Sequence, residues 1–343
     1  MIFTKAKIAS LAHVLPPILV SSEDLETRLA PHYERCKLPA GRLELQTGIK
    51  QRGHWPVGTA PSLIATEAAE KCLSKSSIAR DKIDLLIFAS VCRDFLEPAT
   101  ASVVHQKLGL SPHCQHYDLS QACLGVMSGI DLAAKLIESE QINAALIVSG
   151  ENSGPLIKQT VELLNTNEKI DRKESKKYVA NLTIGSAGVA VLVTKNGWAS
   201  EGHQILASSV MSDTSANHLC QGSGDQSGLM METNSPELLQ AGVNLAYANW
   251  QNLKSEMKWN NDSADKYITH QVGSAHRELL YKSCELNLAK DFSSFEQWGN
   301  TGSAALPLTL SLASEAKFLK KGDTVAMLGI GSGISSVMLG VEW

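Results

Sequence analysis

Residues 116–141 read HYDLSQACLGVMSGIDLAAKLIESEQ, and the architecture of the chain can be worked out from this segment. A short extended piece leads to Cys123, and an amphipathic helix follows with Met127, Ile130 and Ala134 on one face. The free N–H groups and partial positive charge of a helix N-terminus stabilise a thiolate. We therefore expect Cys123 to be a nucleophile with a lowered pKa; the alternative is a buried core cysteine.

The same order of helix, turn and strand recurs near the end of the chain. Residues 123–154 run from Cys123 through a helix to INAALIVSGENSG, and residues 303–335 run from Ser303 through a helix to GDTVAMLGIGSGIS. We interpret this echo as two related halves, 1–195 and 196–343. The alternative is chance, because any two strand–helix units are alike.

Apolar strands and amphipathic helices alternate through both halves. Runs that are apolar on both faces predict buried strands over Ile83–Val91, Ala145–Ser149, Val189–Val193 and Val325–Gly329. Helical spacing predicts helices over Ser62–Leu73, Ala99–Leu108, Leu124–Ser139, Pro236–Glu256, Ala275–Leu286 and Ala304–Leu319. This alternation predicts an α/β fold whose sheets are covered on both sides. We also expect a surface helical excursion over residues 163–180 and a long loop over residues 212–235.

The composition is that of an ordinary globular chain. Its 343 residues suggest about two domains, and 43% of them are apolar and 19% charged. The net charge of −4 gives no basic excess for binding nucleic acid. The seven cysteines are an odd number without a Cys-x-x-Cys pair, which argues against a disulfide framework and a structural zinc site.

Two apolar segments are similar to membrane or export signals, but we interpret both as strands. His13 and the Pro16-Pro17 pair interrupt the first segment, residues 1–20. The second, residues 324–341, contains GIGSGISS, which is unsuited to a spanning helix and predicts two strands around a glycine turn. We expect a soluble cytoplasmic protein.

Three further features carry polar chemistry. His270 ends a predicted strand in KYITHQVGSAH, at the edge of the sheet where α/β active sites form. Asn300 lies in a Gly-Asn-Thr-Gly turn, and the glycine turn at 329–333 lets backbone N–H groups approach a reacting carbonyl. Together with Cys123 these are a nucleophile, a base, a polar partner and an oxyanion donor. The alternatives are a structural histidine, an N-cap asparagine and a dinucleotide fingerprint, but too few residues follow Gly333 to form the helix that the fingerprint needs.

These motifs, in this order, carry a family resemblance. With ACLG at Cys123, HQ at His270, GNTGSA at Asn300 and the glycine turn, the whole chain resembles the thiolase superfamily in its ketoacyl-ACP synthase III branch. The phrases IASLAHV, SVCRDFLEPATAS, HQVG and MLGIGSG are similar to the acyl-CoA condensing thiolases of bacterial long-chain olefin biosynthesis. The resemblance implies a homodimer of thiolase fold, a five-layered αβαβα sandwich built from two similar halves.

The resemblance also implies roles for single residues. Cys123 would accept an acyl group from a thioester, and His270 and Asn300 would polarise the carbonyl of a second thioester. The backbone N–H groups of Cys123 and Ser332 would form the oxyanion hole. Substrate contacts are expected at Gly302, Gly331 and Gly333. No cofactor is implied, since CoA or acyl carrier protein thioesters are the substrates, and His54 and His276 do not group with other ligands into a metal site.

Glu97 separates two kinds of condensation. A decarboxylating enzyme generates its carbanion by losing CO₂, whereas joining two simple acyl thioesters requires a base that removes an α-proton. In the olefin-pathway enzymes that the chain resembles, a glutamate in this context reaches into the partner subunit's site, and Glu97 matches it. The alternative is that Glu97 caps a helix starting at Pro98. Arg93 and Asp94 are interpreted as a surface or interface pair.

The chain departs from the usual synthase III pattern around the substrate entrance. Gly273 replaces the asparagine of His-Gln-Ala-Asn, Arg42 and Gln46 replace the usual Trp and Arg, and Ala275 replaces a basic residue. We predict a Claisen condensation of two acyl thioesters. Decarboxylating synthase III chemistry and a catalytically idle partner subunit stay as alternatives, whereas a papain-like protease is discounted on Ser120 and Leu124.

Overall fold

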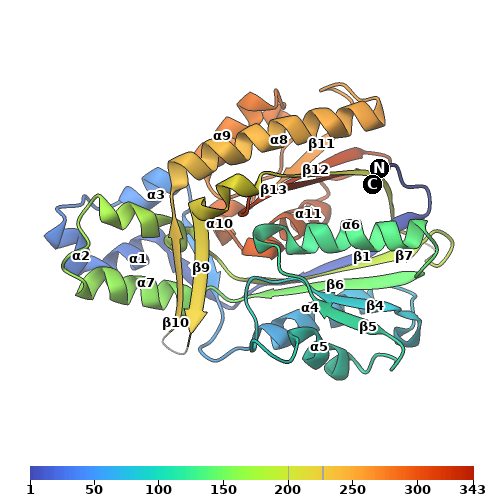
Figure 1. Cartoon of the computed structure of the whole chain (residues 1–343), viewed down its shortest axis with the longest axis horizontal. Helices are drawn as coiled ribbons and strands as arrows, with labels where there is room; N and C mark the ends of the chain where they lie inside the picture. Colours follow the sequence, from blue (N-terminus) through green and yellow to red (C-terminus); the bar gives the residue numbers. More distant parts are fainter. Residues whose placement is uncertain (200, 226–227) are drawn as a thin grey trace.

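The structure is a computed structural model that describes residues 1–199, 201–225 and 228–343. In this part of the chain nine strands form one mixed sheet, in the order β11-β12-β13-β8-β1-β7-β6-β4-β5 (Figure 1). Their bounds are β1 Ala6–Val14, β4 Leu85–Phe88, β5 Gln115–Asp118, β6 Ala144–Glu151, β7 Ala187–Lys195, β8 His203–Ser212, β11 Lys266–Thr269, β12 Thr324–Gly331 and β13 Ser335–Glu342. All four predicted buried strands are therefore present. The expected Ile83–Val91 strand is shorter, because the chain leaves the sheet after Phe88.

The sheet consists of two similar halves. β1 pairs antiparallel with β7, β7 antiparallel with β6, and β6 parallel with β4. β8, β13, β12 and β11 repeat this order of antiparallel, antiparallel and parallel pairs. β1 and β8 then join the halves through the pairs Lys7–Gln204 and Ile8–His203. The division that we expect near residue 196 falls in the connection between β7 and β8.

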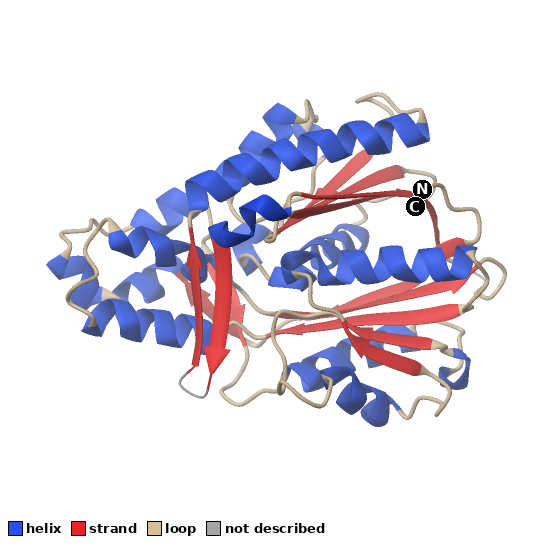
Figure 2. Ribbon diagram, viewed as in Figure 1, coloured by secondary structure: helices blue, strands red, loops and turns tan. Residues whose placement is uncertain are grey.

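Helices lie on both faces of each half (Figures 1 and 2). α4 (Pro61–Ser74) and α5 (Thr100–Leu108) cover the outer face of the first half, and α8 (Ser235–Met257) and α9 (Ser274–Ser283) cover that of the second. α6 (Gly125–Glu138) and α11 (Ala305–Glu315) lie between the halves. This arrangement confirms the predicted αβαβα layers, and each predicted helix is found within a few residues of its expected bounds.

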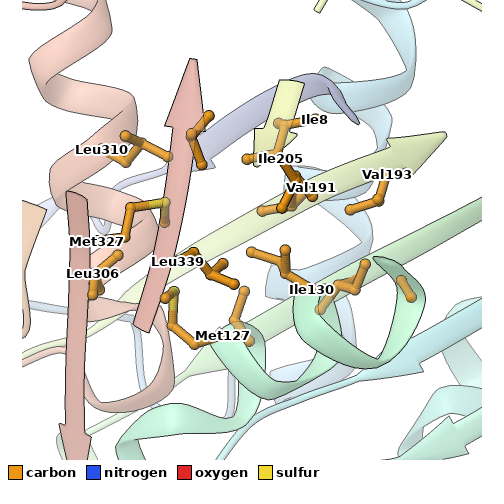
Figure 3. Packing of buried hydrophobic residues seen from close by; sticks show 14 of the residues in the cluster. Ile8, Met127, Ile130, Val191, Val193, Ile205, Leu306, Leu310, Met327 and Leu339 are labelled. Atoms are coloured by element: carbon orange, nitrogen blue, oxygen red, sulfur yellow. The ribbon is translucent and has the colours of Figure 1, made fainter. Parts of the chain in front are cut away.

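The central layer is the largest hydrophobic core (Figure 3). Ile130 of α6 and Leu306 of α11 pack with Val191 of β7 and with Met327 and Leu339 of β12 and β13. Each large side chain buried in this way stabilises the fold by roughly 1.5–3 kcal/mol. Because both central helices are held in the same core, their N-terminal ends are fixed relative to each other.

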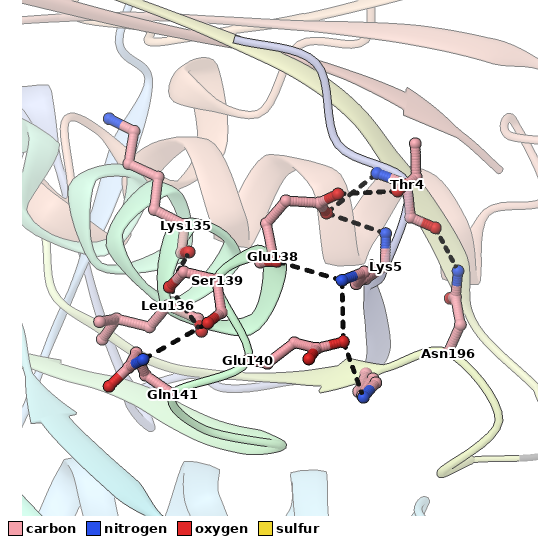
Figure 4. A network of polar contacts seen from close by, with 10 residues as sticks. Thr4, Lys5, Lys135, Leu136, Glu138, Ser139, Glu140, Gln141 and Asn196 are labelled. Carbon is pink, nitrogen blue, oxygen red and sulfur yellow. Dashed lines mark hydrogen bonds and ion pairs between the residues drawn. The ribbon is translucent and has the colours of Figure 1, made fainter.

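The first strand is attached to the C-terminal end of α6 (Figure 4). The Glu138 carboxylate accepts hydrogen bonds from the backbone N–H groups of Thr4 (3.0 Å) and Lys5 (2.9 Å) and from the Thr4 hydroxyl (2.7 Å). Asn196 donates to the Thr4 carbonyl (2.8 Å). These contacts hold β1 at the centre of the sheet, where it joins the two halves.

A third group of elements lies at one end of the sandwich (Figure 1). It consists of α1 Ser22–Arg28, α2 Ala30–Arg35, α3 Arg42–Thr47, α7 Gly154–Thr166, the 3-10 segment η3 Glu174–Thr183, and the strand pairs β2 Ile18–Ser21 with β3 Gln51–His54 and β9 Cys220–Asp225 with β10 Gly228–Thr233. The prediction of a long loop over 212–235 was wrong. A 3-10 helix, Thr214–Leu219, and the β9–β10 hairpin replace it, and residues 226 and 227 of the expected loop lie outside the described residues.

Within the described residues, no helix is both long and apolar enough to cross a membrane. The uncharged segment at the end of the chain forms β12 and β13, which pair antiparallel around the glycine turn as predicted.

Candidate active site

The structure brings Cys123, His270 and Asn300 together in one cavity of about 410 Å³ that opens to solvent. Cys123 lies in the 3-10 turn Ala122–Leu124 that leads into α6. His270 directly follows β11, and Asn300 follows the short helix α10 (Phe295–Trp298). The three residues are far apart in the sequence. They converge because β11 ends, and α6 begins, at the same side of the layered core.

Cys123 is presented to the cavity by a strained backbone. Ala122 has a φ of 44°, which is unusual for a residue with a side chain and is found most often at functional sites. The expectation of a lowered pKa was wrong. Burial, and to a smaller extent the nearby Glu151 carboxylate, raise the pKa of the Cys123 thiol to about 12, and a hydrogen bond with the Asn300 side chain only partly opposes them. The resting nucleophile is therefore a neutral thiol.

His270 is neutral as well. Its backbone N–H donates to the Leu328 carbonyl (2.9 Å), which continues the β11–β12 ladder and fixes the ring at the end of the strand. Burial lowers the pKa of His270 to about 3, and the neighbouring His276 contributes to this shift. The His270 Nδ1 has no hydrogen-bond partner among the described protein atoms. A neutral imidazole in a closed site can accept the thiol proton or donate a hydrogen bond to a substrate carbonyl.

Asn300 is held by its backbone on both sides. Its N–H donates to the Thr183 carbonyl (2.9 Å), and its carbonyl accepts from Gly185 (2.8 Å). Its side-chain Oδ1 accepts from the Gly302 N–H (3.1 Å). The alternative of an N-cap asparagine was wrong, because Thr301 and Ala304 hold the N-cap positions of the 3-10 turn Gly302–Ala304 and of α11. The Asn300 side chain also forms a hydrogen bond with Cys123.

The glycine turn packs directly against the residue after Cys123. A Cβ atom at Gly329 would lie 2.7 Å from the Leu124 side chain, and one at Gly331 would lie 2.9 Å from it. Any larger residue would push the turn away from the nucleophile. Ser332, at the end of β12, lines the cavity near Cys123, as the proposed oxyanion pair requires.

The expected substrate glycines are placed differently from one another. Gly331 lines the cavity, but Gly302 and Gly333 do not belong to its described wall. Gly302 instead lies against the Glu151 carboxylate, where a Cβ atom would come within 3.1 Å of Oε1. Gly333 lies in the turn beyond Ser332. Of the three glycines, Gly331 is thus the one in the described wall, and substrate contact by Gly302 and Gly333 stays a prediction.

Glu151, which the sequence analysis did not single out, and Ser303, which opens the second part of the internal echo, connect the loops of the site. The buried Glu151 carboxylate accepts from the N–H groups of Val91 (2.9 Å), Cys92 (3.3 Å) and Ser303 (3.1 Å). The Ser303 hydroxyl donates to the Ala89 carbonyl (2.7 Å) and accepts from the Val126 N–H (3.0 Å). A carboxylate directly after an apolar strand was the only sequence signal, and Glu151 lies in the SGENSG part of the internal echo.

Glu97 is exposed and does not line the cavity of its own chain within the described residues. The alternative reading, that Glu97 caps the next helix, was wrong. α5 begins at Thr100, and the Asp118 carboxylate accepts from the N–H groups of Thr100 (2.8 Å) and Ala101 (2.8 Å).

The Asp94 carboxylate accepts from the Ser62 N–H (2.9 Å) at the start of α4, so Asp94 is a helix cap and not the partner of Arg93.

At the entrance of the cavity, position 273 departs from the usual synthase III pattern for a steric reason. Gly273 leaves no room for a side chain, because a Cβ atom there would lie 2.8 Å from the Thr47 carbonyl oxygen. Arg42 and Gln46 of α3 and Lys176 of η3 form the opposite wall. His276 lines the cavity, whereas no group of three or more His, Cys, Asp or Glu residues among the described positions could hold a metal ion.

The neutral state of Cys123 gives a testable pH dependence. Iodoacetamide reacts with thiolates, and the thiolate fraction of a thiol with a pKa of about 12 rises about tenfold per pH unit below that value. We expect the alkylation rate of Cys123 to rise continuously from neutral pH to about pH 10, measured by intact-protein mass spectrometry. Cys123→Ser gives the background from the other cysteines. A rate that is already constant near neutral pH would show a thiolate–imidazolium pair instead.

The chain is similar to known proteins over its whole length. Residues 117–214 match the model of 3-oxoacyl-[acyl-carrier-protein (ACP)] synthase III, and residues 255–343 match the model of its C-terminal part. An acyl-CoA:acyl-CoA alkyltransferase of Shewanella oneidensis is 36% identical over 351 residues, with 100% of both chains covered. One of Xanthomonas campestris is 35% identical over 343 residues, also with 100% of both covered. A beta-ketoacyl-[acyl-carrier-protein] synthase III of Natranaerobius thermophilus is 26% identical, covering 99% of this chain and 100% of that protein.

Solved structures of Xanthomonas campestris OleA are similar over the whole chain. One variant with a replaced glutamate has a TM-score of 0.95 at 34% identity, covering 100% of this chain and 98% of that one. A variant with a replaced cysteine, with bound lauric acid and lauroyl-CoA, has a TM-score of 0.94 at 34% identity, covering 99% and 100%. In that protein the replaced glutamate precedes the replaced cysteine by the same number of positions as Glu97 precedes Cys123.

Proposed function

The chain belongs to the 3-oxoacyl-ACP synthase III family of thiolase-like condensing acyltransferases, and from this membership we propose that it joins two acyl-CoA molecules by a Claisen condensation without decarboxylation. One observation carries the proposal. A role as helix cap would explain Glu97 structurally, but Asp118 caps α5 in its place. A carboxylate without a structural task, spaced from the nucleophile as in OleA, is a suitable base for removing an α-proton.

The first half-reaction acylates Cys123. The thiol sulfur attacks the acyl thioester carbonyl while its proton passes to the neutral His270, which returns it to the departing CoA sulfur. The N–H groups of Cys123 and Ser332 stabilise the oxyanion of the tetrahedral intermediate. Free CoA leaves, and the acyl group remains on Cys123. The raised pKa of Cys123 suits this order, because the proton is removed only as the carbon–sulfur bond forms.

The second half-reaction forms the carbon–carbon bond. The carbonyl of a second acyl-CoA accepts hydrogen bonds from His270 and Asn300, which stabilise the enolate formed when Glu97 takes the α-proton. The carbanion attacks the acyl carbonyl on Cys123 and displaces the sulfur, which takes up the proton that Glu97 removed, so that both residues return to their starting states. The product is a 2-alkyl-3-ketoacyl thioester, or the free β-keto acid after hydrolysis.

Glu97 reaches a cavity only if a second subunit is present. It lies in an exposed loop with Val91, Phe95 and Leu96, whose exposed fractions are 50%, 45% and 90%. The loop adjoins β5, an edge strand of the large sheet. Exposed edge strands and apolar patches are typical of subunit interfaces. A homodimer with twofold symmetry would place the Glu97 loop of each subunit at the site of the other.

The cavity entrance supports CoA as the acyl carrier. Arg42 and Lys176 line it, and both side chains suit the phosphates of CoA. The OleA structure with lauroyl-CoA shows that a similar protein binds such a substrate. Neither observation concerns acyl carrier protein, which stays the alternative carrier of the acyl group.

The function is tested by offering the purified enzyme a long-chain acyl-CoA alone, and then together with malonyl-CoA or malonyl-ACP. We expect a β-keto acid, or the ketone that it forms by losing CO₂, from acyl-CoA alone, with release of free CoA, detected by mass spectrometry. A product that appears only with malonyl substrates would instead assign decarboxylating synthase III chemistry. Acylated Cys123 without either product would contradict both condensations.

A further inference from the structure

The cavity that holds the catalytic residues also has an apolar wall along α8, which we call the α8 channel. Leu238, Leu239 and Gly242 of α8 form one side, and Ile330 and Ile334 form the other. The charged residues among the described lining, Arg42 and Lys176, lie at the entrance and not here. An apolar channel that starts at an acylated nucleophile suits an unbranched alkyl chain.

The channel ends at Gly242. Leu238, Leu239 and Gly242 recur on the same face of α8. One turn further along this face, Leu245 and Ala246 are buried in the core between α8 and the sheet, and neither belongs to the described cavity wall. Gly242 is therefore the innermost contribution of α8 to the channel.

The backbone does not require a glycine at position 242. It lies in the interior of the 23-residue helix α8, in a region where glycine destabilises a helix relative to alanine. A Cβ atom there would have one neighbour within 4 Å, the Ile330 Cγ2 atom at 3.3 Å. A longer side chain would extend from this position into the channel. The 3.3 Å contact is closer than ordinary van der Waals packing, so the glycine both lets Ile330 of β12 approach α8 and leaves this part of the channel open.

The channel connects to the nucleophile around the end of β12. Gly331 packs against Leu124, the residue after Cys123, and the preceding Ile330 faces Gly242 from the other side of the strand. An alkyl chain attached to Cys123 can thus pass the end of β12 and enter the channel.

We propose that Gly242 determines the length of the acyl chain that Cys123 accepts, by leaving the end of the α8 channel open for the terminal methylene groups of medium and long chains. The proposal rests on the proposed function only in that Cys123 is the acylated residue. It adds the class of substrate, an unbranched acyl-CoA whose chain extends beyond the first turns of α8.

The test compares Gly242→Leu with the wild-type enzyme over a series from hexanoyl-CoA to palmitoyl-CoA. Acylation of Cys123 is measured by intact-protein mass spectrometry, so the result does not depend on condensation. We expect Gly242→Leu to react with hexanoyl-CoA within about threefold of the wild-type rate and with palmitoyl-CoA at least about tenfold more slowly, because the terminal methylenes lose their buried site. Hexanoyl-CoA serves as the internal control for folding.

Two further variants separate the channel from the helix. Gly242→Ala adds a single methyl group, for which Ile330 must shift slightly, and should lower the palmitoyl-CoA rate less than Gly242→Leu does. Asn244→Leu places the same leucine on the exposed face of α8 and should leave the whole series unchanged. An unchanged length profile in Gly242→Leu, or an equal loss at all lengths, would overturn the proposal. If the wild-type enzyme acylates Cys123 but forms no condensation product, only the proposed function fails.

Discussion

Cys123→Ala is expected to form no acyl-enzyme with any acyl-CoA and to lose at least about 10⁴-fold in turnover, the loss typical of a missing covalent nucleophile. The reason is structural as well as chemical. The strained Ala122 backbone and the close packing of Gly331 on Leu124 place this one sulfur at the oxyanion donors. Intact-protein mass spectrometry with lauroyl-CoA, together with assay of released CoA, measures the effect.

The controls for this variant use the other thiols of the chain. Cys36→Ser removes a partly buried thiol on α2, away from the cavity, and should keep both the adduct and the turnover. Cys220 is the important competitor, because it lines the same cavity and lies close enough to affect the charge of Cys123. A stoichiometric acyl adduct on Cys123→Ala would contradict the assignment and would identify Cys220 as the nucleophile.

The positions of the site residues could be predicted because each lies where a regular element begins or ends. A strand that ends at His270, a helix that begins after Cys123 and a turn at Asn300 can all be recognised from periodicity and glycine placement. Strands that are apolar on both faces predicted a sheet covered on both sides, whereas the five layers were implied by the family resemblance. These are local signals, and the structure keeps them because each agrees with the global packing.

The features that could not be predicted depend on distant parts of the chain. The pKa of Cys123 rises because tertiary packing buries the thiol beside Glu151, and this outweighs the helix N-terminus that the sequence displays. The cap of α5 comes from Asp118 at the end of β5, and not from the neighbouring Glu97. The β9–β10 hairpin forms from a Gly- and Ser-rich stretch without alternating apolar residues, so the pattern that predicts strands was absent.

Glu97→Gln is expected to uncouple the two half-reactions. Acylation of Cys123 and release of the first CoA should stay within about threefold of wild type, whereas condensation should fall by about 10²–10⁴-fold, the usual contribution of a general base. Single-turnover acylation and product formation, measured separately, give the two rates. Glu162→Gln makes the same change on the exposed surface of α7 and should affect neither. Equal losses in both half-reactions would show that Glu97 serves folding or binding and is not the base.

Mixed subunits decide whether Glu97 acts on its own cavity or on that of its partner. Glu97→Gln and Cys123→Ala are each inactive in condensation alone. After subunit exchange of an equal mixture, about half of the dimers contain one subunit of each kind, and in these one site combines an intact Cys123 with the Glu97 of the partner. Recovery of about a quarter of wild-type condensation is then expected.

If Glu97 instead served its own chain, no site in the mixture would contain both groups, and the activity would stay at the level of the separate variants. The exposed Glu97 loop, the absence of Glu97 from the described wall of its own cavity and the edge position of β5 all favour recovery.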